Sequence, residues 1–199
     1  MIGQPLKLGF LASGNGTSAR AIVGAIQAGE LAAEARLMVS NNRKAPALEW
    51  ARKAGVPALC IPTQVDPVGA DESLAAELAA HGVELIVLSG YLRKLGPATL
   101  AKYRGRILNI HPGPLPEFGG HGMYGRRVHE AVLAANARES GVAIHLVDEE
   151  YDRGPIVAQR AVVIEPGDTP ELLEARVNAV EPRFFVEVLR LISEGKLAI

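Results

Sequence analysis

Short apolar segments alternate with helical stretches through the first half of the chain, and this alternation constrains the fold more than any other feature. The apolar runs at residues 6–12, 35–40, 58–61 and 84–89 predict strands. Between them, residues 18–28, 46–54 and 71–81 carry apolar side chains at three- and four-residue spacing, which predicts helices. Gly55 and Gly82 follow two of these helices, where glycine commonly ends a helix. Such strand–helix–strand units are typical of a parallel sheet.

The second half of the chain has a different pattern. Residues 106–110, 142–147 and 156–164 predict strands, and residues 123–136 predict a helix. The last two strands could pair as an antiparallel or mixed edge. A final helix is predicted from Thr169 as N-cap, with Pro170 at its first position, to about residue 194. We expect one α/β domain over residues 1–199, a Rossmann-like, mostly parallel twisted sheet flanked by helices.

The charge balance narrows the classes of partner. A formal net charge of -1 gives no extended positive field, which disfavours binding to bulk nucleic acid. No apolar run approaches membrane-spanning length, so we expect no membrane partner. The single Cys60 cannot form an intramolecular disulfide and is expected to be a buried structural thiol in a reducing cytoplasm. Apolar edge strands could support a homodimer, although no pattern identifies its interface.

A glycine-rich segment from Ser13 to Ser18 follows the first predicted strand and opens the first predicted helix. Backbone N–H groups and the helix dipole favour a phosphate at that position. A nicotinamide-cofactor enzyme would place an acidic residue at the end of the second strand, but residues 40–42 read Ser-Asn-Asn. A Walker-type loop is excluded because no Lys-Ser or Lys-Thr pair follows. A phosphate monoester therefore fits best, and a purely structural strand-to-helix turn is the alternative.

Asn109 and His111 end the next predicted strand, at positions where alternation puts both side chains on one side. An amide donor and an imidazole can then face one reacting atom. The prolines and glycine of residues 112–116 hold the following loop in a stiff path, as expected of a pre-organised site. The alternative is a structural histidine at a strand end.

Asp152 lies in an acidic turn that Gly154 and Pro155 end sharply. Its carboxylate could point back across the sheet toward His111, raise the pKa of the imidazole and orient the ring. The histidines at 81, 121, 129 and 145 match no zinc spacing, so no metal is expected. His145 has two open interpretations, a supporting role at the site or a structural one.

At these residues the sequence resembles the phosphoribosylglycinamide formyltransferase family, folate-dependent enzymes of purine synthesis, over nearly the whole chain. The resemblance rests on the segments at residues 13–18, 39–41, 88–93, 108–112, 115–116 and 152–155. The Asn-x-His-Pro motif with a downstream Asp is shared by folate-dependent formyltransferases in general. The Ser-Gly-Asn-Gly loop is more specific to the glycinamide enzymes.

The resemblance implies formyl transfer from 10-formyltetrahydrofolate, as co-substrate, to the amine of N1-(5-phospho-D-ribosyl)glycinamide in the synthesis of IMP. It implies the catalytic residues Asn109, His111 and Asp152. The implied phosphoribosylglycinamide contacts are Gly14, Asn15, Gly16, Thr17, Ser18, Asn178 and Glu181. The implied folate contacts are Leu92, Arg93, Lys94, Leu95, Asn109, Val147, Asp148, Glu149, Glu150, Tyr151 and Asp152. Residues from about 1 to 100 would bind phosphate, and those from about 101 to 199 would bind folate and carry the catalysis.

A mechanism follows as a hypothesis from these roles. Asn109 and a protonated His111 donate hydrogen bonds to the tetrahedral oxyanion, while Asp152 keeps His111 cationic. No covalent intermediate is needed, because the amine is itself a nucleophile.

Three features depart from the family pattern, and the first two lie near the expected folate entrance. The stretch 119–127 is longer than in the commonest form, Arg153 replaces a small residue, and no arginine between residues 63 and 71 matches one that contacts the folate tail. The alternatives are another folate formyltransferase, a formyltetrahydrofolate hydrolase, a non-catalytic nucleotide-binding module and a nicotinamide oxidoreductase.

Overall fold

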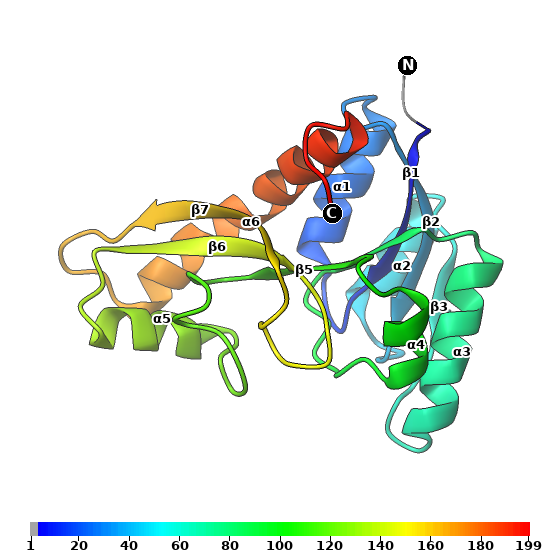
Figure 1. The fold of residues 1–199 in the computed structure, drawn as a ribbon, viewed down its shortest axis with the longest axis horizontal. Coiled ribbons are helices and arrows are strands. Elements are labelled where there is room, and N and C mark those ends of the chain that lie inside the picture. The colour runs from blue at the N-terminus through cyan, green and yellow to red at the C-terminus, as the bar shows by residue number, and fades with distance from the viewer. Residues whose placement is uncertain (1–3) are drawn as a thin grey trace.

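The computed structural model describes residues 4–199, so the first three residues of the expected domain lie outside the described part. Within that part, one seven-stranded sheet has the order β3-β2-β1-β4-β5-β6-β7 (Figure 1). The strands are β1 (Leu6–Leu11), β2 (Ala33–Ser40), β3 (Ala58–Cys60), β4 (Leu85–Leu88), β5 (Ile107–His111), β6 (Glu139–Leu146) and β7 (Ile156–Val163). The helices are α1 (Thr17–Gln27), α2 (Pro46–Lys53), α3 (Pro67–Ala80), α4 (Pro97–Lys102), α5 (Arg126–Ala134) and α6 (Pro170–Ser193).

The predicted fold class is confirmed. Strands β1 to β5 pair in parallel, whereas β6 is antiparallel to both β5 and β7. Side chains alternate between two cores: Leu8 and Phe10 belong to the core shared with α1 and α6, and Leu11 belongs to the core shared with α3. Both faces of the parallel part are therefore buried, which explains why its strands read as continuous apolar runs.

The boundaries of two predicted helices were wrong. Helix α3 starts at Pro67, where the Asp66 side chain caps it by accepting from Gly69 N at 2.9 Å. Helix α5 starts only at Arg126, because residues 123–125 belong to the preceding loop. The predicted glycine C-caps are confirmed, since Gly55 and Gly82 have φ values of 77° and 67°.

Helix α4 was absent from the sequence-based prediction, and its N-terminus is capped from another helix. Asp71 of α3 is 8% exposed, and its carboxylate accepts from the backbone N–H groups of Ala98 at 2.7 Å and Thr99 at 3.2 Å. The Thr99 hydroxyl donates back to the Asp71 carbonyl at 3.3 Å. Gly96 is needed beside this cap because a Cβ there would overlap the Asp71 side chain. Helices α3 and α4 thus form one unit.

Asp71→Ala is expected to lower the free energy of unfolding by about 2 kcal/mol, because it leaves two N–H groups of α4 without their buried acceptor. Urea unfolding followed by circular dichroism measures the change. Thr169→Ala, which removes the cap of α6 at an exposed position, is the control and should cost about 1 kcal/mol. A loss for Asp71→Ala no larger than that of the control would contradict the cross-helix cap.

Candidate active site

A cleft of about 1280 Å³ opens at the carboxyl ends of the parallel strands. Strand β1 lies between β2 and β4, so the chain reverses its direction of travel through the sheet there. Ligands of open α/β sheets bind at such a switch point. Gly14 and its neighbours to Ser18 line one part of the cleft, and Asn109, His111 and Asp152 line another. Its volume exceeds that typical of a site for one small molecule, about 300–1,000 Å³.

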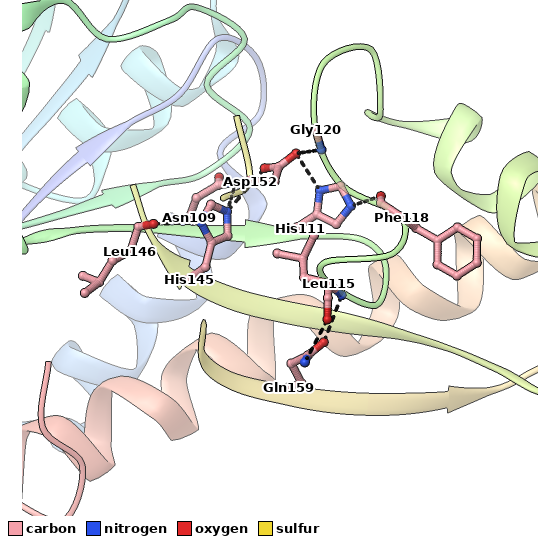
Figure 2. A network of polar contacts seen from close by, with 9 residues as sticks. All are labelled: Asn109, His111, Leu115, Phe118, Gly120, His145, Leu146, Asp152 and Gln159. Atoms are coloured by element: carbon pink, nitrogen blue, oxygen red, sulfur yellow. Dashed lines mark hydrogen bonds and ion pairs between the residues drawn. The ribbon is translucent and has the colours of Figure 1, made fainter. Parts of the chain in front are cut away.

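Strand pairing brings the predicted catalytic side chains together. In the antiparallel pair of β5 and β6, Asn109 lies directly opposite His145, and Nδ2 of Asn109 is 3.1 Å from Nε2 of His145. His111 lies two residues further along the same face of β5. Figure 2 shows Asp152 above this pair of strands, between His111 and the Asn109–His145 pair.

The Asp152 carboxylate lies close to both histidine rings and forms an ion pair with either one only when that ring is protonated. Its Oδ2 is 3.5 Å from Nδ1 of His111, and its Oδ1 is 3.4 Å from Nε2 of His145. The expected orientation of the Asp152 carboxylate toward His111 is therefore present in the structure. Asp152 has a φ of 54°, a left-handed conformation that Asp tolerates better than most residues but that still carries strain.

The loop after β5 holds both members of the His111–Asp152 pair. The Phe118 carbonyl oxygen is 2.7 Å from Nε2 of His111, and the Gly120 N–H donates to Oδ2 of Asp152 at 3.0 Å (Figure 2). A carbonyl oxygen only accepts, so Nε2 must carry hydrogen, and the proton that titrates sits on Nδ1, facing Asp152. The amide of Gln159 anchors this loop to β7 by bonding both backbone groups of Leu115.

The ionisation of the pair differs from the sequence-based expectation. Burial lowers the pKa of His111 below its ordinary value, and the raising effects of Asp152 and the Phe118 carbonyl do not reverse this. Burial would raise the pKa of Asp152, but hydrogen bonding with His145, the charge of His111 and the Gly120 N–H together bring it below its ordinary value. The expectation of a net upward shift for His111 is therefore wrong for the free cleft, because the ring is only 3% exposed.

Glu181 of α6 also lines the cleft. Burial raises the pKa of its carboxyl to about 7. A carboxyl that ionises near neutrality suits contact with a ligand that carries N–H groups or a positive charge. The helix continues through Pro182, directly after this residue.

Glu181→Gln is expected to change how stability depends on pH. The unfolded chain ionises this carboxyl near 4.5 and the folded protein near 7, so between these values the folded state holds the extra proton and stability falls as pH rises. The variant should be more stable than the wild type by up to about 3 kcal/mol at pH 8 and should show no such advantage near pH 4.5. Urea unfolding at several pH values measures this, with the exposed Glu130→Gln as control. A constant difference across the pH range would contradict the assignment.

The other predicted contacts are distributed over the cleft and its surroundings. Leu92, Arg93 and Tyr151 line the cleft, whereas Lys94 and Leu95 line a smaller adjacent pocket of about 350 Å³. Val147 is half-buried at the end of β6, and Asp148, Glu149, Glu150 and Asn178 are exposed. Tyr151 contacts His121 edge to face and has the Lys94 ammonium 5.7 Å from its ring centre.

Sequence reasoning undervalued two groups of residues. His145 was left between a supporting and a structural role, and only the β5–β6 register shows it beside Asn109 and Asp152. Asn41 and Asn42 were interpreted from the sequence through the absence of an acid and, for Asn41, through the family resemblance, but not as site residues; both line the cleft, as does Arg43. Within residues 4–199, no group of three or more His, Cys, Asp or Glu side chains is arranged to hold a metal ion. None of the helices in that range is both long and apolar enough to cross a membrane.

A ligand cleft at the switch point of an open sheet, with an Asn–His–Asp set on its wall, defines an α/β enzyme equipped for acid–base chemistry. A family model described as formyl transferase matches residues 6–189. The chain belongs to this family.

Individual relatives agree with the family match. The chain is 40% identical over 194 residues to phosphoribosylglycinamide formyltransferase, chloroplastic, of Arabidopsis thaliana, covering 96% of this chain and 66% of that protein. It is 34% identical to phosphoribosylglycinamide formyltransferase of Bacillus subtilis, covering 92% and 93% of the two chains. The crystal structure of glycinamide ribonucleotide transformylase 1 from Symbiobacterium toebii superposes with a TM-score of 0.90 at 36% identity, covering 99% and 92%. The chain thus spans about two thirds of the length of the plant relative.

Proposed function

We propose that this protein transfers the formyl group of 10-formyltetrahydrofolate to the amine of N1-(5-phospho-D-ribosyl)glycinamide, a step of purine synthesis. The observation that carries the proposal is the convergence of the glycine-rich loop, the Asn109–His111–Asp152 set and Glu181 on one cleft. The names of relatives that match over most of both chains support the choice of substrates.

In the proposed binding mode, the substrate phosphate occupies the start of α1. The backbone N–H groups of residues 14–18 and the helix dipole favour a dianion there. Glu181 contacts the glycinamide end of the substrate. Asn178, one turn earlier on α6, is proposed to contact the same substrate from the exposed side. The folate lies along Leu92 to Leu95 and the turn from Val147 to Asp152, with its formyl carbon near Asn109. In this proposal the first half of the chain binds the phosphate, the second half carries the catalytic residues, and both halves contact the folate. Both ligands are small molecules.

The proposed chemistry balances without a covalent enzyme intermediate. The amine nitrogen bonds to the formyl carbon, the carbonyl electrons move onto oxygen, and the bond from carbon to the folate nitrogen then breaks. One proton leaves the attacking nitrogen and one reaches the folate nitrogen. Asn109 Nδ2 has a second N–H available for the oxyanion, and an oxyanion competes with the Phe118 carbonyl for the hydrogen on His111 Nε2.

The ionisation of His111 refines this mechanism. Because burial lowers its pKa, the neutral ring leaves Nδ1 free of a proton beside the Asp152 carboxylate, so the pair can accept a proton from the amine and return it to the folate nitrogen. A protonated ring is favoured only once negative charge develops on the oxygen. The cytoplasm is the expected compartment, whereas the plant relative carries a chloroplast location in its name.

The test is an absorbance assay for deformylation of 10-formyl-5,8-dideazafolate, with and without phosphoribosylglycinamide. Turnover that requires the amine is the expected result. Turnover without the amine would indicate a formyltetrahydrofolate hydrolase. Absence of turnover under both conditions would leave a non-catalytic binding module.

A further inference from the structure

Two serine side chains link the glycine-rich loop to the loop after β4. The Ser13 hydroxyl accepts a hydrogen bond from the Leu92 backbone N–H at 2.8 Å. In the reverse direction, the hydroxyl of Ser89, at the end of β4, accepts from the backbone N–H of Ala19, in the first turn of α1, at 3.0 Å. Each loop therefore supplies a hydroxyl to the backbone of the other.

The Ser13 hydroxyl also reaches a third loop. It donates to Oδ1 of Asn41, after β2, at 2.6 Å, so both its hydrogen and an oxygen lone pair are used. The backbone N–H of Ser13 donates to the Gly90 carbonyl at 3.0 Å. One side chain therefore connects the loops that follow β2, β1 and β4, which are neighbouring strands at the switch point.

These links join the sites proposed for the two substrates. Ser13 directly precedes the residues proposed to hold the phosphate, and Leu92 is the first residue of the proposed folate segment. The Leu92 side chain is 74% exposed, so packing of that side chain contributes little to holding the loop. The hydrogen bond from its N–H to Ser13 is then a main restraint on the direction of that backbone.

We propose that Ser13 is a positioning residue that couples the binding of the two substrates, an inference that rests on the proposed function. A phosphate bound at the glycine-rich loop holds Ser13 in place, and Ser13 in turn fixes the Leu92 backbone that receives folate. Ordering one loop lowers the entropy cost of ordering the other, so the coupling is positive. By linkage it is equal in both directions.

The experiment measures affinity rather than turnover. Fluorescence titration gives the Kd of 5,8-dideazafolate, which carries no formyl group to transfer, with no phosphoribosylglycinamide and with a saturating amount. In the wild type, the affinity for the folate analogue is expected to rise about fivefold or more when the amine substrate is bound. The reciprocal titration must give the same factor.

Ser13→Ala should reduce this coupling factor to about twofold or less, since one hydrogen bond contributes about that difference. Ser89→Ala should reduce it as well, and it serves as the second variant if Ser13→Ala folds poorly. Ser13→Thr, which keeps the hydroxyl, should restore it. Thr169→Ala, which loses a cap on α6 remote from both loops, controls for general destabilisation and should keep the wild-type factor.

The outcomes separate the two claims. A wild type that binds both ligands with no coupling, or a Ser13→Ala variant with wild-type coupling, would overturn the role of Ser13 while the proposed function stands. A wild type that binds neither ligand would overturn the proposed function and this inference with it.

Discussion

His111→Ala is expected to lower turnover by about a hundredfold or more while the affinity for both substrates changes only severalfold. The substitution removes the Nε2 hydrogen proposed for the oxyanion and the imidazole that faces Asp152 at 3.5 Å. It also leaves the Asp152 carboxylate, 12% exposed, with His145 and the Gly120 N–H as its remaining partners. Steady-state kinetics combined with ligand titration separates the two effects.

Two further variants sharpen this result. Asp152→Asn keeps the shape of the side chain and its acceptor for the Gly120 N–H but removes the charge, so it should lose turnover by a similar factor. His81→Ala removes a histidine at the end of α3 and should leave turnover unchanged. Lost binding with normal turnover in His111→Ala would refute the catalytic assignment.

Gly154→Ala is expected to be the most disruptive single-methyl change in the turn that carries Asp152. A Cβ at this buried glycine would overlap the Leu146 carbonyl oxygen at the end of β6. The turn must move away from the strand, and it carries Asp152 with it. We expect a loss of about 2–3 kcal/mol in unfolding free energy and a fall in turnover of at least about tenfold in the protein that remains folded.

Gly24→Ala is the matched control for that change. Gly24 lies within α1, where an added Cβ meets no atom within 4 Å. Alanine should therefore stabilise the protein by about 0.5–1 kcal/mol. Urea unfolding and kinetics at a temperature well below the transition test both variants. Wild-type stability and turnover in Gly154→Ala would show that the turn is not held by this contact.

The alternation of strands and helices was readable from the sequence because buried parallel strands are short apolar runs with little else in them. Helix α4 was not readable, because it has six residues and its cap comes from Asp71, which lies more than twenty positions earlier in the chain. That the side chains of Asn109 and His111 lie on the same face of β5 follows from strand geometry alone. The position of His145 depends on the register between β5 and β6, a non-local property that no local pattern encodes.

The backbone groups at the site could not be predicted from the sequence either. Phe118 acts through its backbone carbonyl and Gly120 through its backbone N–H. Every residue has a carbonyl and every residue except proline has an N–H, so the sequence does not single out these positions. The sign of the His111 pKa shift also depended on burial, which competes with the charge of Asp152 and can be judged only from packing. Side-chain identity thus indicated the proposed chemistry, while the ionisation of the groups could be judged only from the three-dimensional structure.

The change of strand direction after β5 has a consequence for engineering. Because β6 and β7 run antiparallel, the connection of residues 147–155 brings Asp152 to the ligand edge of the sheet, where a parallel continuation would have needed a helical crossover. Two exposed residues of that connection, Glu149 and Glu150, are therefore the positions to vary, since they belong to none of the parallel strands. Libraries of variants at these positions would test other acidic side chains and other amine substrates on a scaffold whose parallel sheet is unchanged.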